Sequence, residues 1–103
     1  MIRKKSYKVI WDINAKAHLK ELIEALAVRY SEKFIEHIKE EIERHMKYIG
    51  QRPKMFPIDI LKVDNNGSYR YFNVPAIRIA YKIESTLIIV LRVSHQNQEP
   101  KEY

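Results

Sequence analysis

The stretch that decides the fold reads YRYFNVPAIRIAYKIESTLIIVLRVSH and covers residues 69–95. Its β-branched and aromatic runs predict three strands, at 69–74, 77–83 and 87–93. The two connections between them are short enough to force antiparallel neighbours. The last run is apolar on both faces, which is typical of a central strand. The C-terminal half is therefore expected to form a three-stranded meander.

Residues 6–11 alternate apolar and polar side chains with a period of two, which predicts a first strand with one buried face. Asp12 or Asn14 then offers a short side-chain oxygen to cap a helix. Apolar residues recur from there at spacings of three and four as far as about Tyr30. The pattern predicts an amphipathic first helix.

A second helix is expected to begin with Ser31 as its N-cap and to end at Gly50 in a left-handed turn. So few residues separate the two helices that they must form an antiparallel hairpin. Pro53 and Pro57 exclude a helix in the next segment, which is predicted to be a loop leading to a short extended piece at 58–63. Residues 64–67, Asp-Asn-Asn-Gly, are the strongest turn signal in the chain.

The predicted fold class is α+β, with the order β-α-α-β-β-β and a short additional strand, in one domain of 103 residues. The helical hairpin would pack on one face of a mainly antiparallel, curled sheet and leave the other face free. The chain has no cysteine, which excludes disulfides, thiolate metal sites and thiol nucleophiles. The apolar segment after the basic start is too short for a signal peptide, so we expect a cytoplasmic protein.

The formal net charge is +6, and the excess lies at the N-terminus and in the C-terminal half. These regions would suit a polyanion or an acidic protein partner, or the charge would serve solubility alone. His37, Glu41 and His45 have the spacing of metal ligands on a helix, but that helix face is rich in Glu and Lys that can pair with one another. We expect neither a metal site nor a cofactor.

The strands from Tyr69 to His95 carry a more specific pattern. Arg78 is followed by an apolar residue, a further residue and Tyr81, and the last strand closes on His95, with Glu99-Pro100 soon after. In these positions, and in residues 7–11, the chain resembles the RelE/ParE family of toxins from type II toxin-antitoxin systems. The resemblance implies a growth-inhibiting toxin and a cognate antitoxin whose flexible segment wraps the toxin's basic face.

The family has two branches, and the resemblance implies one of two targets. RelE-like members are mRNA interferases that cut mRNA in the ribosome, whereas ParE-like members poison DNA gyrase and are not nucleases. Metal-free RNA cleavage needs a proton carrier and cations around one phosphate. The candidate catalytic residues are Arg78, His95, Arg70 and Lys54. The candidate RNA-binding residues are Arg52, Lys62, Arg92 and Tyr103.

Other readings of these residues stay open. Arg70 and Arg78 would also fit ordinary strand positions paired with Asp or Glu, and His95 would also fit a strand end that binds the backbone. A dense lysine cluster before the meander, seen in several ribosome-dependent members, is missing here. The long helical hairpin at 15–49 favours the ParE-like branch. The sequence leaves the mRNA interferase and the gyrase poison open.

Overall fold

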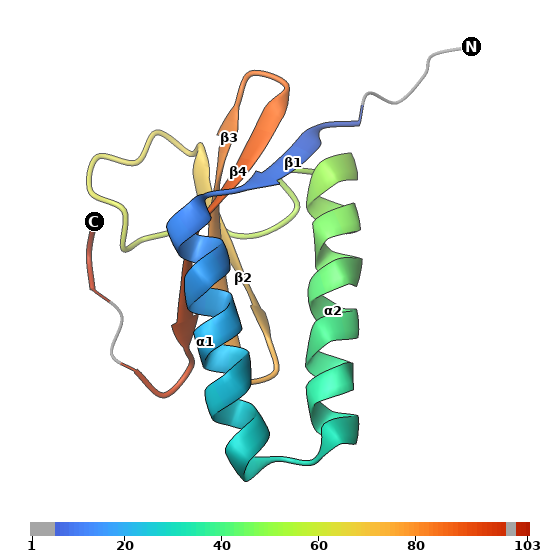
Figure 1. Cartoon of the computed structure of the whole chain (residues 1–103). Helices are drawn as coiled ribbons and strands as arrows, with labels where there is room; N and C mark the ends of the chain where they lie inside the picture. Colours follow the sequence, from blue (N-terminus) through green and yellow to red (C-terminus); the bar gives the residue numbers. More distant parts are fainter. Residues whose placement is uncertain (1–5, 99–100) are drawn as a thin grey trace.

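The structure is a computed structural model and describes residues 6–98 and 101–103. The basic run at 1–5 and the Glu99-Pro100 pair, both used in the sequence analysis, lie outside the described residues. Figure 1 shows two helices beside a sheet of four strands. In chain order the elements are β1 (Lys8–Trp11), α1 (Ile13–Arg29), α2 (Glu32–Gln51), β2 (Tyr69–Val74), β3 (Ile77–Glu84) and β4 (Leu87–His95). This order confirms the predicted α+β class.

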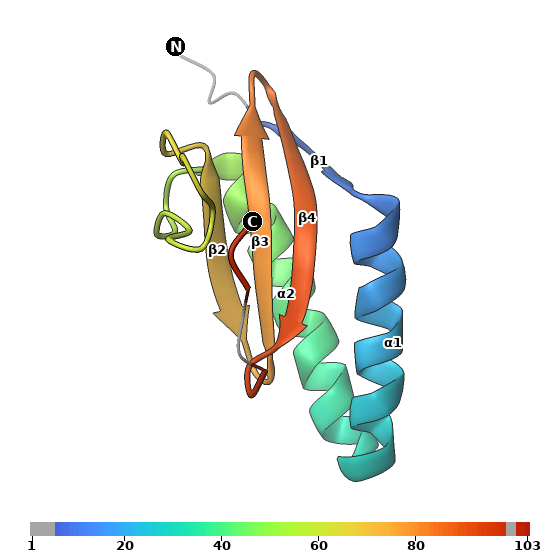
Figure 2. The same ribbon diagram turned by 90° about the vertical axis from the view of Figure 1, so that its left-hand side faces the viewer.

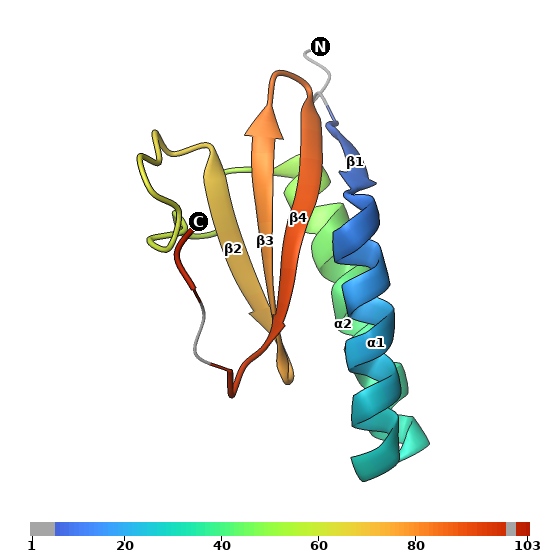
Figure 3. The ribbon, with the colours of Figure 1, turned by 60° about the vertical axis from the view of Figure 1, so that its left-hand side comes forward.

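The four strands lie in the order β1-β4-β3-β2 (Figure 3). β4 pairs antiparallel with β3 and parallel with β1, so the strand that is apolar on both faces is central, as predicted. The register of β3 and β4 shifts between Ala80 and Tyr81, where Leu91 has no partner. Such a bulge bends the strand and increases the local twist of the sheet.

Both helices pack on the same side of the sheet, and Figure 2 shows α2 behind the strands and α1 beside β4. The predicted caps are present: the Asp12 carboxylate accepts hydrogen bonds from two backbone N–H groups of α1, and the Ser31 hydroxyl accepts one from Phe34. The core lies between the helices and the sheet. Its fully buried members include Ile38 and Ile49 of α2 and Ile79 and Tyr81 of β3.

Gly50 does not end α2 in a left-handed turn, and this prediction was wrong. The helix continues to Gln51, and Gly67 is the one described glycine with a positive φ, of 98°. Gly50 instead lies against the first strand, where its carbonyl accepts a 2.8 Å hydrogen bond from the N–H of Tyr7. A Cβ atom at this position would come within 3.4 Å of the Tyr7 carbonyl oxygen. Residue 50 therefore lies in the contact between the helix and the first strand, with just enough room for a methyl group.

The extended piece predicted at 58–63 is also not a strand. Ile58 makes one isolated antiparallel bridge with Arg70, and the chain then turns. The cause is Asp59, whose carboxylate accepts the N–H of Leu61 and whose carbonyl accepts the N–H of Lys62. These local bonds compete with strand pairing. Within residues 6–98 and 101–103, no helix combines the length and apolar character needed to cross a membrane.

Candidate functional site

The sheet face opposite the helices carries a group of cationic and aromatic side chains. Strand register fixes which residues share this face, because cross-strand partners project together and successive residues alternate. Tyr69 lies opposite Lys82, Asn73 opposite Arg78, and Ala80 opposite Arg92. The open face is therefore positive, whereas their neighbours in sequence, such as Ile79, point into the core.

Asp59 is the centre of this group and is fully buried. Its Oδ1 atom lies 2.7 Å from Nη2 of Arg78, and its Oδ2 atom accepts a 2.7 Å hydrogen bond from the Tyr103 hydroxyl. Burial alone would raise the pKa of Asp59, but the hydrogen bonds from Arg78, Tyr103 and the Leu61 N–H outweigh it and lower the pKa below its ordinary value of 3.8. The carboxylate is therefore ionised at neutral pH.

Tyr103 brings the C-terminal segment across the open face (Figure 2). Its N–H donates to the carbonyl of Leu61, and its carbonyl accepts from the N–H of Val63. Its ring lies 4.1 Å from the Arg92 guanidinium carbon and 5.6 Å from Nζ of Lys62. Burial, followed by the hydrogen bond to the Asp59 carboxylate, raises the pKa of the phenol. Tyr103 is therefore a protonated donor at neutral pH.

Arg78 is enclosed on two sides. Its guanidinium pairs with Asp59 and lies 4.0 Å from the centre of the Tyr71 ring, and its side chain is only 15% exposed. This matches the alternative in which a strand arginine pairs with an acid. The positive charge of Arg78 is already balanced by a buried carboxylate.

Arg70 has a different role in the fold. Its Nε and Nη1 atoms donate to the carbonyls of Gly67, Phe56 and Lys54, at 3.0, 2.8 and 3.2 Å. Arg70 lies opposite Tyr81 in the sheet, whereas Arg78 lies opposite Asn73, so the two arginines project from opposite faces. They are not placed to bind one phosphate together.

His95 ends β4 and follows Ser94, the partner of Arg78, so the histidine and Arg78 also point to opposite faces. Its Nδ1 atom accepts a 3.0 Å hydrogen bond from the N–H of Asn97. This is the strand-closing arrangement considered in the sequence analysis. Lys54 and Arg52 are exposed on the loop after α2 and line a surface hollow with Tyr7.

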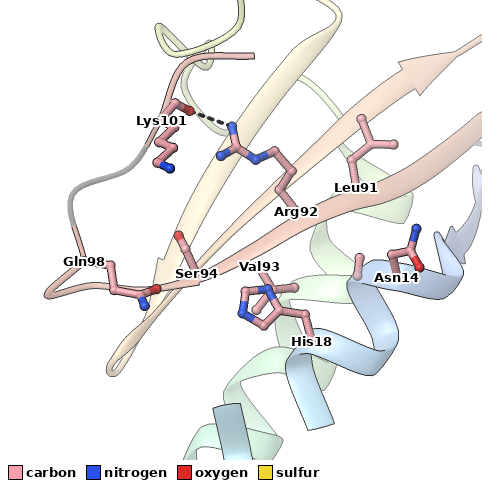
Figure 4. Close-up of a pocket in the computed structure, with 9 residues that line it drawn as sticks. Asn14, His18, Leu91, Arg92, Val93, Ser94, Gln98 and Lys101 are labelled. Carbon is pink, nitrogen blue, oxygen red and sulfur yellow. Dashed lines mark hydrogen bonds between the residues drawn. The ribbon is translucent and has the colours of Figure 1, made fainter. Parts of the chain in front are cut away.

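Of the eight sequence-predicted site residues, the structure brings together Arg78, Lys62, Arg92 and Tyr103, and leaves the other four elsewhere. The sequence analysis missed Asp59, whose only signal was an acidic residue between two isoleucines. It also missed an open pocket of about 420 Å³ beside Arg92 (Figure 4). There Arg92 donates a 2.9 Å hydrogen bond to the carbonyl of Lys101, and His18 of α1 lines the opposite side.

The histidines of α2 do not form a metal site with Glu41. The His45 ring packs against Phe56 and Phe72, with ring centres 5.5 and 4.7 Å apart, and its Nδ1 atom lies 2.7 Å from the backbone oxygen of Glu41. Across the part of the chain that the structure describes, no group of three or more His, Cys, Asp or Glu side chains is placed to hold a metal ion. His45 therefore belongs to an aromatic cluster between α2 and β2.

This chain is similar to a solved structure in its fold and to a protein-family model in its sequence. A search of curated proteins found no match. Among solved structures, the fold is similar to a mutant of the Escherichia coli toxin RelE in the free state, with a TM-score of 0.58, 11% identity, and coverage of 89% of this chain and 85% of that one. The family model of the ParE toxin of the type II toxin-antitoxin system parDE matches residues 9–100. The chain therefore belongs to the RelE/ParE family of type II toxins, which confirms the resemblance.

Proposed function

We propose that this toxin inhibits growth by binding DNA gyrase and trapping it on cleaved DNA, and that it does not cut mRNA. The observation that supports this most directly is the ion pair between Arg78 and the buried Asp59, with 2.7 Å between Nη2 and Oδ1. Because the buried Asp59 carboxylate already neutralises Arg78, the ion pair as a whole attracts a substrate phosphate only weakly. The match to the ParE family model supports the same choice.

The arrangement of the other candidates also supports a binding protein. Metal-free RNA cleavage needs a base, an acid and a cation around one phosphate group. Arg70 and His95 project from the sheet face opposite to Arg78, and the Tyr103 hydroxyl is engaged by Asp59. The raised pKa of Tyr103 keeps its phenol protonated, so the side chain is not available to accept a proton from RNA. The groups that would have to act together are therefore dispersed.

The second candidate function is a ribosome-dependent mRNA interferase. One observation favours it: Lys62, Lys82 and Arg92 lie over the rings of Tyr69 and Tyr103 on the open face. Cations interleaved with aromatic rings suit single-stranded RNA, because the rings can stack on bases. On this reading, Lys62, Arg92 and Tyr103 would bind RNA.

A plasmid-cleavage assay tests the first proposal. Purified toxin is incubated with DNA gyrase, supercoiled plasmid and ATP, and trapped complexes are released with detergent and protease. We expect linear plasmid that requires both toxin and gyrase. A reaction in which toxin leaves the gyrase products unchanged would rule this target out.

Toeprinting of translated mRNA tests the second candidate in parallel. Codon-linked cuts that vanish in His95→Ala and Arg78→Ala would establish the interferase and refute the gyrase proposal. We expect no such cuts, and we expect His95→Ala to retain growth inhibition. In either case the family implies a cognate antitoxin as a further partner. We place the toxin in the cytoplasm, where both targets occur, and treat the whole chain as one toxin domain.

A further inference from the structure

The loop between α2 and β2 exposes an unusual number of apolar side chains. Nine large hydrophobic residues are exposed among those that the structure describes, and four of them fall within the nine residues from Met55 to Val63. Met55 is 54% exposed, Ile58 46%, Ile60 88% and Val63 49%. Single exposed apolar residues are ordinary on protein surfaces, but a concentration of them indicates a binding surface.

The polarity of the loop is also inverted at its centre. Ile58, Asp59 and Ile60 follow one another, and the acid is fully buried whereas both isoleucines are exposed. A loop that served only to connect α2 with β2 would be more stable with the isoleucines inside and the aspartate in water. The fold therefore exposes two isoleucine side chains that would be more stable if they were buried.

Hydrogen bonds from backbone and side-chain donors fix the loop in this arrangement. The N–H of Asp59 donates to the Tyr69 carbonyl at 2.9 Å, and the Asn65 side chain donates to the carbonyls of Asp59 and Tyr69, both at 2.9 Å. The N–H of Val63 donates to the Tyr103 carbonyl at 2.6 Å, and Arg70 binds the carbonyls of Lys54 and Phe56. A loop that is ordered before binding loses little conformational entropy when it docks.

The charges of the loop complement its apolar residues. Arg52 and Lys54 are exposed before the apolar group, and Lys62 lies within it. Asp59 is the one acid between Arg52 and Val63, and its charge is paired with Arg78 inside the protein. Asp64, directly after Val63, is exposed, so the apolar segment is bordered by three basic residues and one acid. The surface that this segment offers to a partner is therefore apolar with a mainly cationic border.

We propose that residues 55–63 form the surface through which the toxin docks on its target protein. The complementary site would be an apolar pocket bordered by carboxylates, because such a pocket would accept the isoleucines and pair with the lysines. This inference rests on the proposed function in one respect, namely that the target is a protein. It adds the part of the toxin that makes the contact.

The test uses Ile60→Glu and a matched control, Val28→Glu. Val28 lies on α1 and is 87% exposed, so both variants place a carboxylate at an equally exposed apolar position. Met55→Glu provides a second loop variant at a less exposed site. Circular dichroism and thermal unfolding establish that each variant is folded, and binding to immobilised DNA gyrase and growth arrest in cells are then measured.

We expect Ile60→Glu to bind gyrase at least about tenfold more weakly than the unmodified toxin, with Met55→Glu weakened in the same direction. Val28→Glu should bind and arrest growth as the unmodified toxin does. If folded Ile60→Glu and Met55→Glu still arrest growth like the control, the loop is not the target surface and the inference is overturned. Retained toxicity with loss of neutralisation by an antitoxin would overturn it as well, and would assign the loop to that partner.

The growth measurement separates this inference from the gyrase proposal. If the unmodified toxin does not bind gyrase, that proposal fails, but the loop can still be tested. Loss of growth arrest in Ile60→Glu, with arrest retained in Val28→Glu, would then support docking of the loop on a different target protein.

Discussion

Replacing Asp59 with Asn tests whether the buried carboxylate holds the open-face group together. The substitution keeps the size of the side chain but removes its charge, so Arg78 is left in a largely buried site, 15% exposed, without a counter-ion. Breaking a buried ion pair by removing one partner typically costs 3–5 kcal/mol, and the partial exposure of Arg78 places this case near the lower end, at about 3 kcal/mol. In a domain of this size the midpoint of thermal unfolding should fall by about 15 °C.

The effect should depend on pH with a sign that follows from the pKa of Asp59. That pKa is lowered in the folded protein, so the ionised carboxylate contributes its full stability above its unfolded value of 3.8 and loses it as the pH falls through the folded pKa. The difference between the unmodified protein and Asp59→Asn should be complete at pH 7 and should shrink at pH 3.

Urea unfolding followed by circular dichroism measures both quantities. Asp64→Asn is the matched control, because Asp64 is an exposed acid in the same loop, and we expect it to change the free energy of unfolding by less than about 0.5 kcal/mol. If Asp59→Asn is as stable as this control at pH 7, the ion pair with Arg78 does not stabilise the fold. A difference that grows at pH 3 would refute the assigned direction of the pKa shift.

Three further substitutions test other features by urea unfolding. Gly50→Ala should stabilise the protein by about 0.5 kcal/mol, because the residue is helical and its new Cβ meets the Tyr7 oxygen at an ordinary 3.4 Å; a clear loss would favour the left-handed turn instead. Gly67→Ala should destabilise it by about 1 kcal/mol, because φ is 98°, and an unchanged stability would contradict that strain. Tyr81→Phe should cost about 1.5 kcal/mol, because the buried phenol donates to the Pro53 carbonyl at 2.6 Å; a neutral result would mean that the bond does not hold the loop.

The features predicted correctly from the sequence depend on local signals. Asp12 and Ser31 cap helices through bonds to residues two or three positions away, and the continuous apolar run of β4 indicates its central place in the sheet, with Ile88, Val90 and Val93 buried in the core. The β-branched and aromatic runs also located the three strands of the meander. The connections of two or three residues between them then required antiparallel neighbours. These elements could be located without knowledge of the rest of the chain.

The features that could not be predicted depend on distant partners. Asp59 lies 19 residues from Arg78 and 44 residues from Tyr103, so nothing near it in sequence indicates that a carboxylate would be buried there. Gly50 carries the usual signal for a helix end, but its contact with Tyr7 has no local signature. In the candidate site, the alternation of side chains along each strand, together with the strand register, places Arg70 and His95 on the sheet face opposite to Arg78. The functional roles of these three residues remain predictions.

The parallel pairing of β1 with β4 affects when the fold can form. Lys8 lies opposite Leu87, so β1 finds its partner only after residues 87–90 of β4 have been synthesised. Contacts this distant in sequence make folding slow, because a large loop must close before the pairing is stabilised. A nascent chain whose residues 87–95 have not yet left the ribosome lacks one of the two central strands of the sheet. Folded toxin is therefore absent for an interval after translation of the chain begins.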